Sequence, residues 1–133
     1  MKTPTILIAL MSVMVVVFAG VALAKVINGD DNDNRLRGTQ HNDTINGKGG
    51  DDFINGRKGN DKLFSGSSED KVDTGPGTDF VDAVDRSKDE IVCLHGNDRV
   101  RANPGDVVNT GRPPEFGPEG RCEEIIREGI RVN

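Results

Sequence analysis

Aspartate residues recur at a fixed spacing in the middle of this 133-residue chain. They stand nine positions apart and follow an asparagine in the same register: Asn34, Asp43, Asp52, Asp61, Asp70 and Asp79. Five positions before each comes a small residue: Gly29, Gly38, Gly47, Gly56, Ser65 and Thr74. Glycine permits a tight turn in which carbonyl oxygens converge, and each Asp adds a carboxylate. Oxygen ligands of this kind suit a hard cation such as Ca²⁺.

The elements that position these carboxylates follow from an aliphatic residue two positions after each of them. In the same register the chain carries Ile27, Leu36, Ile45, Ile54, Leu63, Val72 and Val81. Each nine-residue unit therefore predicts six residues of turn and three of strand, with the aliphatic side chain pointing inward and its polar neighbours outward. One unit cannot bury its aliphatic residue alone, but a stack of units can. We expect an all-β protein, a parallel β-roll (β-solenoid).

Two units make one coil of 18 residues, so alternate units share a sheet. Ile27, Ile45, Leu63 and Val81 should line one sheet, and Leu36, Ile54, Val72 and Ile91 the other. Asp52 should lie between Asn34 and Asp70 on one flank, with Asp43, Asp61 and Asp79 on the opposite flank. Carboxylates stacked about 4.8 Å apart repel by about 1–3 kcal/mol per pair. A Ca²⁺ ion between successive turns would offset this repulsion.

The pattern resembles the hemolysin-type, or RTX, calcium-binding repeat, G-G-x-G-x-D-x-U-x, in which U is a large aliphatic residue. The segments GKGGDDFIN (47–55) and GRKGNDKLF (56–64) match it best, although Lys48 and Arg57 replace the second glycine. The resemblance covers residues 27–82 well and 83–108 loosely, because the register slips by one after Val81. It implies a β-roll with calcium held between turns of one flank.

The metal-site residues predicted on this basis are the glycines and aspartates of the matching turns. They are Gly38, Asp43, Gly47, Gly49, Gly50, Asp52, Gly56, Gly59, Asp61, Gly66, Asp70, Gly75, Gly77 and Asp79. Many family members are large toxins, lipases or proteases, and nothing in this chain is large enough to be their catalytic domain. The chain looks more like the small, stand-alone exported calcium-binding proteins of bacteria.

Composition agrees with a calcium-binding domain and argues against a nucleic-acid partner. Residues 25–133 carry 16 Lys and Arg against 22 Asp and Glu, and all 15 Asp lie between Asp30 and Asp106. Such a surface repels nucleic acid and anionic lipid. Low hydrophobicity and high charge are also typical of disorder. A disordered linker would not keep a nine-residue register, however.

Residues 1–24 have the pattern of a secretory signal peptide. Lys2 precedes an uncharged, mostly apolar stretch. The stretch ends in GVALA (20–24), where small residues alternate with larger ones before Lys25. The alternative is an uncleaved membrane anchor, because about 20 apolar residues can span a bilayer. Either interpretation places the rest of the chain outside the cytoplasm, and we expect a secreted protein. A membrane would be a partner only if the segment stays attached.

The C-terminal region lacks the repeat and contains one of the two cysteines. We expect residues 25–108 to form the roll and residues 109–133 to form a cap over its open end. In an exported protein Cys93 and Cys122 predict a disulfide, which would stabilise the fold by about 3–4 kcal/mol. The segment CEEIIREGIRVN (122–133) is compatible with a strand or a short helix.

Other site chemistries fit the sequence poorly. An EF-hand beginning at Asp31 would have Leu36 in place of its glycine and Asn42 in place of its last glutamate. Zinc has only His41 and His95 to bind, without a third ligand nearby, and both are read as exposed turn residues. No catalytic constellation is present, so we expect no enzyme.

The sequence favours a calcium-binding module with a structural or interaction role, and the protein or cell-surface partner is not specified. The alternatives are an accessory domain or non-catalytic remnant of a secreted hydrolase, and a surface adhesin.

Overall fold

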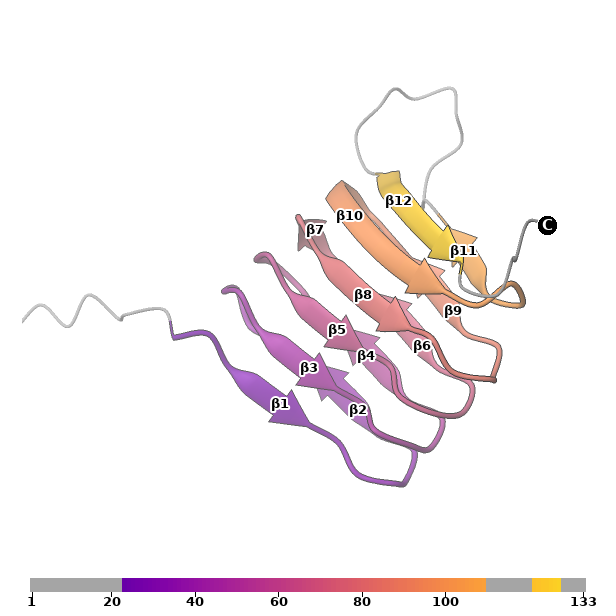
Figure 1. Ribbon diagram of the computed structural model, residues 1–133. Helices are drawn as coiled ribbons and strands as arrows, with labels where there is room; N and C mark the ends of the chain where they lie inside the picture. Colours follow the sequence, from indigo (N-terminus) through magenta and orange to yellow (C-terminus); the bar gives the residue numbers. More distant parts are fainter. Residues whose placement is uncertain (1–22, 110–120, 128–133) are drawn as a thin grey trace, which may run out of the picture.

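The computed structural model describes residues 23–109 and 121–127. Within these two ranges, twelve strands follow one another along a single stack, with the first coil at one end and the last strand at the other (Figure 1). In chain order they are β1 (Val26–Asn28), β2 (Arg35–Arg37), β3 (Thr44–Asn46), β4 (Phe53–Asn55), β5 (Lys62–Phe64), β6 (Lys71–Asp73), β7 (Pro76–Gly77), β8 (Phe80–Ala83), β9 (Glu90–Val92), β10 (His95–Ala102), β11 (Val107–Asn109) and β12 (Arg121–Arg127).

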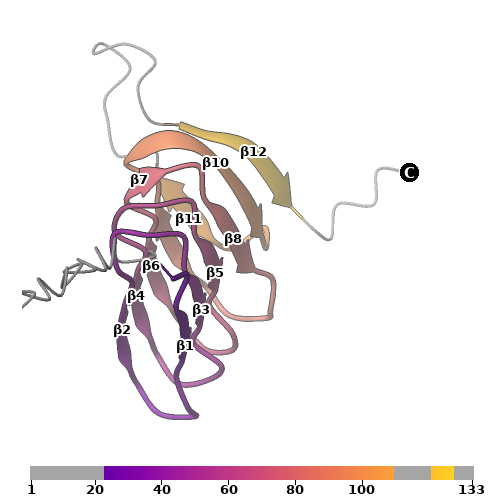
Figure 2. The same cartoon turned by 90° about the vertical axis from the view of Figure 1, so that its left-hand side faces the viewer.

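The strands form two parallel sheets that face each other (Figure 2). The first sheet has the order β1-β3-β5-β8-β10-β12, with the short β7 paired to β10, and the second has the order β2-β4-β6-β9-β11. Ile27 pairs with Ile45, Ile45 with Leu63, and Leu63 with Val81. The predicted β-roll and its assignment of alternate units to alternate sheets are therefore confirmed.

The core is one side chain wide, because each three-residue strand points only its middle residue inward. These central residues have exposed fractions of 0–1%: Ile45, Ile54, Leu63, Val72, Val81, Ile91 and Val100. The same column is only partly buried at its ends, at Ile27, Leu36 and Val108. The fold therefore depends on stacking, since no coil can bury its aliphatic residues without a neighbour.

The register slip predicted after Val81 is present and absorbed in the turns. Val72 pairs with Ile91 and Val81 with Val100, each 19 positions apart instead of 18. Ile91 pairs with Val108 after a shorter step of 17 positions. The inserted and deleted residues lie between strands, so the aliphatic column stays in line.

The C-terminal strand β12 adds to the edge of β10 in parallel and so extends the first sheet. The predicted disulfide is present between Cys93 and Cys122, with a Cα–Cα distance of 5.8 Å. Cys93 is fully buried and Cys122 is 9% exposed. For the segment 122–133 the sequence allowed a strand or a helix. Its residues 122–127 belong to the strand β12, and residues 128–133 lie outside the described part of the chain. The last strand of the second sheet, β11, ends at Asn109. The domain boundaries at 108 and 109 stay predictions.

The predicted signal peptide falls almost wholly outside the described residues, which begin at residue 23. Within residues 23–109 and 121–127 there is no helix with the length and apolar character needed to cross a bilayer.

Candidate metal centre

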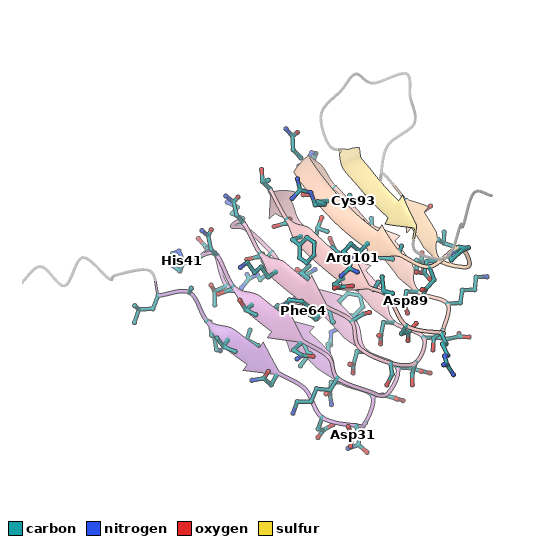
Figure 3. All side chains as sticks on the ribbon, in the orientation of Figure 1. Asp31, His41, Phe64, Asp89, Cys93 and Arg101 are labelled. Carbon is teal, nitrogen blue, oxygen red and sulfur yellow. A yellow bond between two sulfur atoms is a disulfide. The ribbon has the colours of Figure 1, made fainter. Side chains whose placement is uncertain are left out.

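The turns stack on two flanks of the roll, as the spacing predicts. The first flank consists of the turns at 29–34, 47–52, 65–70, 84–89 and 103–106. The second consists of the turns at 38–43 and 56–61, the segment 74–79 that contains β7, and the segment 93–98 that runs into β10. Asp31 of the first flank and His41 of the second lie on opposite sides of the stack (Figure 3). Because each flank repeats once per coil, equivalent turn residues lie directly above one another.

The predicted turn glycines lie against the backbone of a neighbouring coil on their own flank. A Cβ added at Gly50 would come within 2.6 Å of the Asn32 carbonyl oxygen, and one at Gly59 within 2.6 Å of the His41 carbonyl oxygen. Most of the other glycines contact a backbone carbonyl of the neighbouring turn in the same way: Gly38, Gly47, Gly56, Gly66, Gly75 and Gly77. Gly49 is less confined, with the Ser67 hydroxyl oxygen 3.1 Å from such a Cβ. The turns therefore hold carbonyl oxygens in closely spaced layers.

Some turn positions force residues other than glycine into the left-handed region. Lys48 has a φ of 78° and Arg57 a φ of 74°, at the position where the repeat usually has its second glycine. Ser68 has a φ of 89° at the position that Gly50 and Gly59 occupy in other turns. The turn geometry is thus kept even where the sequence lacks the residue that adopts it without strain.

The aspartates form one hydrogen-bonded ladder on each flank. On the first flank the Asn34 amide donates to Asp52 Oδ1 at 2.8 Å, the Asp52 amide to Asp70 Oδ1 at 2.8 Å, and the Asp70 amide to Asp89 Oδ1 at 2.9 Å. On the second flank the amides of Asp43, Asp61 and Asp79 donate to Oδ1 of Asp61, Asp79 and Asp98. One oxygen of each carboxylate therefore accepts an N–H from the preceding coil.

The second carboxylate oxygen, Oδ2, has no hydrogen-bond partner in the middle of the stack. This holds for Asp52, Asp61, Asp70 and Asp79, whose exposed fractions are 1–3%. A buried carboxylate oxygen without a partner costs free energy, because it has lost water and gained nothing in return. Four such atoms at equivalent positions of successive turns are suited to bind a cation.

Electrostatics agree with this interpretation. Burial raises the pKa of Asp61 to about 6, of Asp70 to about 7 and of Asp79 to about 8. Neighbouring aspartates raise these pKa values further, and the ladder N–H groups oppose them. At the N-terminal end, hydrogen bonds from Thr39 and Lys25 outweigh burial, and the pKa of Asp43 is lowered. The middle of the stack is therefore the region where a positive charge would stabilise most.

Side chains alone do not compose a metal site. Residues 23–109 and 121–127 contain no group of three or more His, Cys, Asp or Glu side chains arranged around one point. A Ca²⁺ site can nevertheless draw most of its oxygens from backbone carbonyls, and the stacked turns provide these beside each Asp. The residues present therefore fit a calcium ion whose ligands come from carbonyl groups and single carboxylates.

Comparison with known families matches the same segment. The family model of four copies of the RTX calcium-binding nonapeptide repeat matches residues 28–63 and again residues 47–81. Residues 28–81 therefore match the RTX calcium-binding nonapeptide repeat. None of the curated proteins matches the chain. None of the solved structures matches it either.

RTX repeats bind calcium, so the cation implied by the unpartnered carboxylates is Ca²⁺. The ion would supply positive charge between carboxylates that otherwise repel each other. The predicted site residues lie in stacked turns, but which of them are ligands stays a prediction.

The predicted site omitted the continuation of both ladders beyond residue 79. Asp89, Asp98 and Asp106 are buried and accept ladder N–H groups as the earlier aspartates do. The signal was present, because each stands two positions before an aliphatic residue after the register slip. The roles of Ser65 and Thr74 were missed as well, since the sequence shows them only as small residues in place of glycine.

Proposed function

We propose that the protein is an exported module whose β-roll is stabilised by calcium and which serves a structural or interaction role. Its calcium ligands would be turn carbonyls and aspartates between residues 38 and 79. The observation that carries this proposal is the set of four buried Oδ2 atoms without hydrogen-bond partners, at Asp52, Asp61, Asp70 and Asp79.

Calcium would change the balance between folding and unfolding because it interacts with the folded turns only. Sites in extracellular modules have Kd values of about 10⁻⁴–10⁻³ M. At millimolar Ca²⁺ each such site would contribute up to about 1.4 kcal/mol by mass action. Several sites in one stack would then add a substantial part of the stability of a small domain.

Export is supported by the disulfide and by the N-terminal sequence. A disulfide between Cys93 and Cys122 is typical of proteins that fold outside the reducing cytosol. If residues 1–24 are a cleaved signal peptide, mass spectrometry of protein from the culture medium should find Lys25 at the N-terminus. An intact residue 1 in the membrane fraction would instead support the anchored alternative.

The central experiment is a calcium titration followed by far-UV circular dichroism and calorimetry. We expect the β signal to fall in excess chelator and to return as Ca²⁺ is added. An unchanged spectrum in chelator, together with no heat of calcium binding, would contradict the proposal.

A pair of variants tests where the ions bind. Asp61→Ala should weaken calcium binding, since Asp61 Oδ2 is buried and unpartnered. Asp106→Ala is the matched control: it also removes a ladder acceptor, but both carboxylate oxygens of Asp106 accept N–H groups, from Asp89 and Asn103. The control should lower stability and leave the number of bound ions unchanged. Equal losses of calcium binding in the two variants would refute the assignment.

A further inference from the structure

The two buried hydroxyl groups of Ser65 and Thr74 stand at a position where the earlier turns have glycine. This is the first position of each turn, occupied in chain order by Gly29, Gly38, Gly47, Gly56, Ser65 and Thr74. Both Ser65 and Thr74 are fully buried. Their side chains lie inside the stack, between one turn and the next on the same flank.

Each hydroxyl binds the Oδ2 atom of the aspartate one coil further along. Ser65 Oγ donates to Asp89 Oδ2 at 3.3 Å on the first flank. Thr74 Oγ1 donates to Asp98 Oδ2 at 3.0 Å on the second flank, which is shorter than its contacts to carbonyl oxygens at 3.3 and 3.4 Å. The Oδ2 atom, which has no partner in the four ladder aspartates from Asp52 to Asp79, therefore accepts a hydrogen bond in Asp89 and Asp98.

From Asp52 onward, Oδ2 of the ladder aspartate has a side-chain partner only where the turn one coil earlier begins with a hydroxyl residue. Four aspartates follow a coil whose turn begins with glycine, and all four have an unpartnered Oδ2: Asp52, Asp61, Asp70 and Asp79. The two that follow a coil whose turn begins with Ser or Thr, Asp89 and Asp98, have a partner. For Asp106 the residue at this position one coil earlier is Ala83, which has no hydroxyl. Asp106 Oδ2 instead accepts the N–H of Asn103 in its own turn.

The backbone bonds between coils are also slightly longer at Ser65 and Thr74. The amides of Gly29, Gly38, Gly47 and Gly56 lie 2.8–2.9 Å from the carbonyl oxygen they bind in the next coil. The corresponding distances are 3.2 Å for Ser65 and 3.1 Å for Thr74. At Cys93, which also has a Cβ at this position, the distance to the Asn109 carbonyl oxygen is 2.9 Å. Beyond Thr74 this position continues as Ala83, Cys93 and Ala102, all fully buried.

We propose that the Ser65 and Thr74 hydroxyls take the place of calcium between successive turns, so that the coils ending at Asp89 and Asp98 hold together without the metal. The contacts that the turns ending at Asp52, Asp61, Asp70 and Asp79 make with the preceding turn of their flank depend on the metal. This inference rests on calcium binding by the repeats. It divides one continuous roll into a calcium-dependent N-terminal part and a calcium-independent C-terminal part, the latter also held by the Cys93–Cys122 disulfide.

Hydrogen exchange of the wild-type chain in excess chelator tests the division directly. The amides of Arg99, Cys93 and Val107, which bind carbonyl oxygens of neighbouring coils, should stay protected. Those of Phe53, Lys62 and Lys71 make equivalent bonds lower in the stack and should lose most of their protection. Calcium should restore protection to the second group and change the first little. A uniform loss along the chain would overturn the proposal.

Substitutions at the two hydroxyl positions test the mechanism. Ser65→Gly and Thr74→Gly open the space, and each should add one bound Ca²⁺ in native mass spectrometry and make the coil above it sensitive to chelator. Ser65→Ala and Thr74→Val keep the Cβ but remove the hydroxyl. These two variants should bind no additional ion, but in chelator they should lower the protection of amides near Asp89 and Asp98 from hydrogen exchange.

Ser67→Gly is the matched control, because Ser67 lies in the same turn as Ser65 but is exposed and bonds the Lys48 carbonyl. It should leave the ion count unchanged. A lower ion count in Ser65→Gly or Thr74→Gly would mean that the hydroxyls are calcium ligands and would overturn the inference alone. A wild-type chain that binds no calcium would overturn the proposed function itself.

Discussion

At the scale of single residues, the glycine-like turn positions occupied by larger side chains are the most informative. Lys48 and Arg57 hold left-handed φ values of 78° and 74°, and such conformations cost about 1–3 kcal/mol for residues with a Cβ. Their side chains reach solvent, so nothing in the packing requires them. The turn geometry is imposed by the neighbouring strands and by the bonds between coils.

Arg57→Gly should therefore stabilise the protein, by up to about 1 kcal/mol after the greater chain entropy of glycine is subtracted. Lys58→Gly is the control, since Lys58 is an exposed neighbour in the same turn without a positive φ. Urea unfolding in saturating calcium should show a higher midpoint for Arg57→Gly and a lower or equal one for Lys58→Gly. Destabilisation in both variants would show that strain at Arg57 is negligible.

The raised aspartate pKa values predict an unusual pH dependence for the calcium-free protein. The ordinary pKa of these groups is 3.8, and in the fold those of Asp61, Asp70 and Asp79 rise to about 6, 7 and 8 because of burial. A raised pKa in the folded state contributes stability that is complete below the unfolded value and is lost as the pH rises through the folded value. The calcium-free protein should therefore be more stable at pH 5 than at pH 8.

Calcium binding should show the opposite trend, because the ion needs ionised carboxylates and must displace their protons. Affinity should fall between pH 8 and pH 5, which calorimetry in buffers of different ionisation heat would detect. Asp79→Asn imitates the protonated form and should stabilise the calcium-free protein at pH 8, as Asn34 does naturally in the first coil. A calcium-free protein that gains stability from pH 5 to pH 8 would contradict the assignment of raised pKa values.

At the scale of strands and turns, the roll depends on one aliphatic residue per strand. Leu63 is fully buried and pairs in register with Ile45 below and Val81 above. Leu63→Ala should lower the free energy of unfolding by about 2–5 kcal/mol. Ile27→Ala, in the partly covered end coil, should cost less. Equal losses in denaturant titrations would show that the column does not act as the core.

The disulfide acts at the same scale, because it joins the last regular turn to the strand β12. Reduction, or replacement of both Cys93 and Cys122 by Ser, should lower stability by about 3–4 kcal/mol in the chain-entropy model. Calcium binding by the turns between residues 38 and 79 should change little, since the disulfide lies beyond Asp79. Loss of calcium binding on reduction would show that the cap and the metal sites are coupled.

The sequence predicted most of these elements because the nine-residue register couples each carboxylate to a strand. Ile45, Ile54 and Leu63 determine which residues pair, and the shifted spacing of Asp89 and Ile91 revealed the slip in register. The same sequence could not predict that residues 121–127 form a strand, since that segment owes its conformation to the edge of β10. Nor could it reveal the pairing of Thr74 with Asp98, which are 24 positions apart and lie in successive turns of one flank.

At the scale of the whole molecule, the charge is distributed in an unusual way. The chain carries a net charge of −5, and its ladder aspartates are nevertheless buried along both flanks of a core one side chain wide. Mobile salt screens exposed charges within about 10 Å at 0.1 M but acts weakly on buried ones. A simple salt should therefore screen only weakly the repulsion between the buried aspartates.

Sodium chloride should for this reason not replace calcium. In excess chelator, raising NaCl to about 1 M shortens the screening length to about 3 Å, yet it leaves the four unpartnered Oδ2 atoms without a ligand. We expect the β signal of the N-terminal coils to stay low in circular dichroism and to return only with millimolar CaCl₂. MgCl₂ should be a poor substitute, because Mg²⁺ demands octahedral geometry at about 2.0–2.1 Å and gives up its water reluctantly. Full recovery in NaCl alone would show that net charge, and not a bound ion, governs the assembly of the roll.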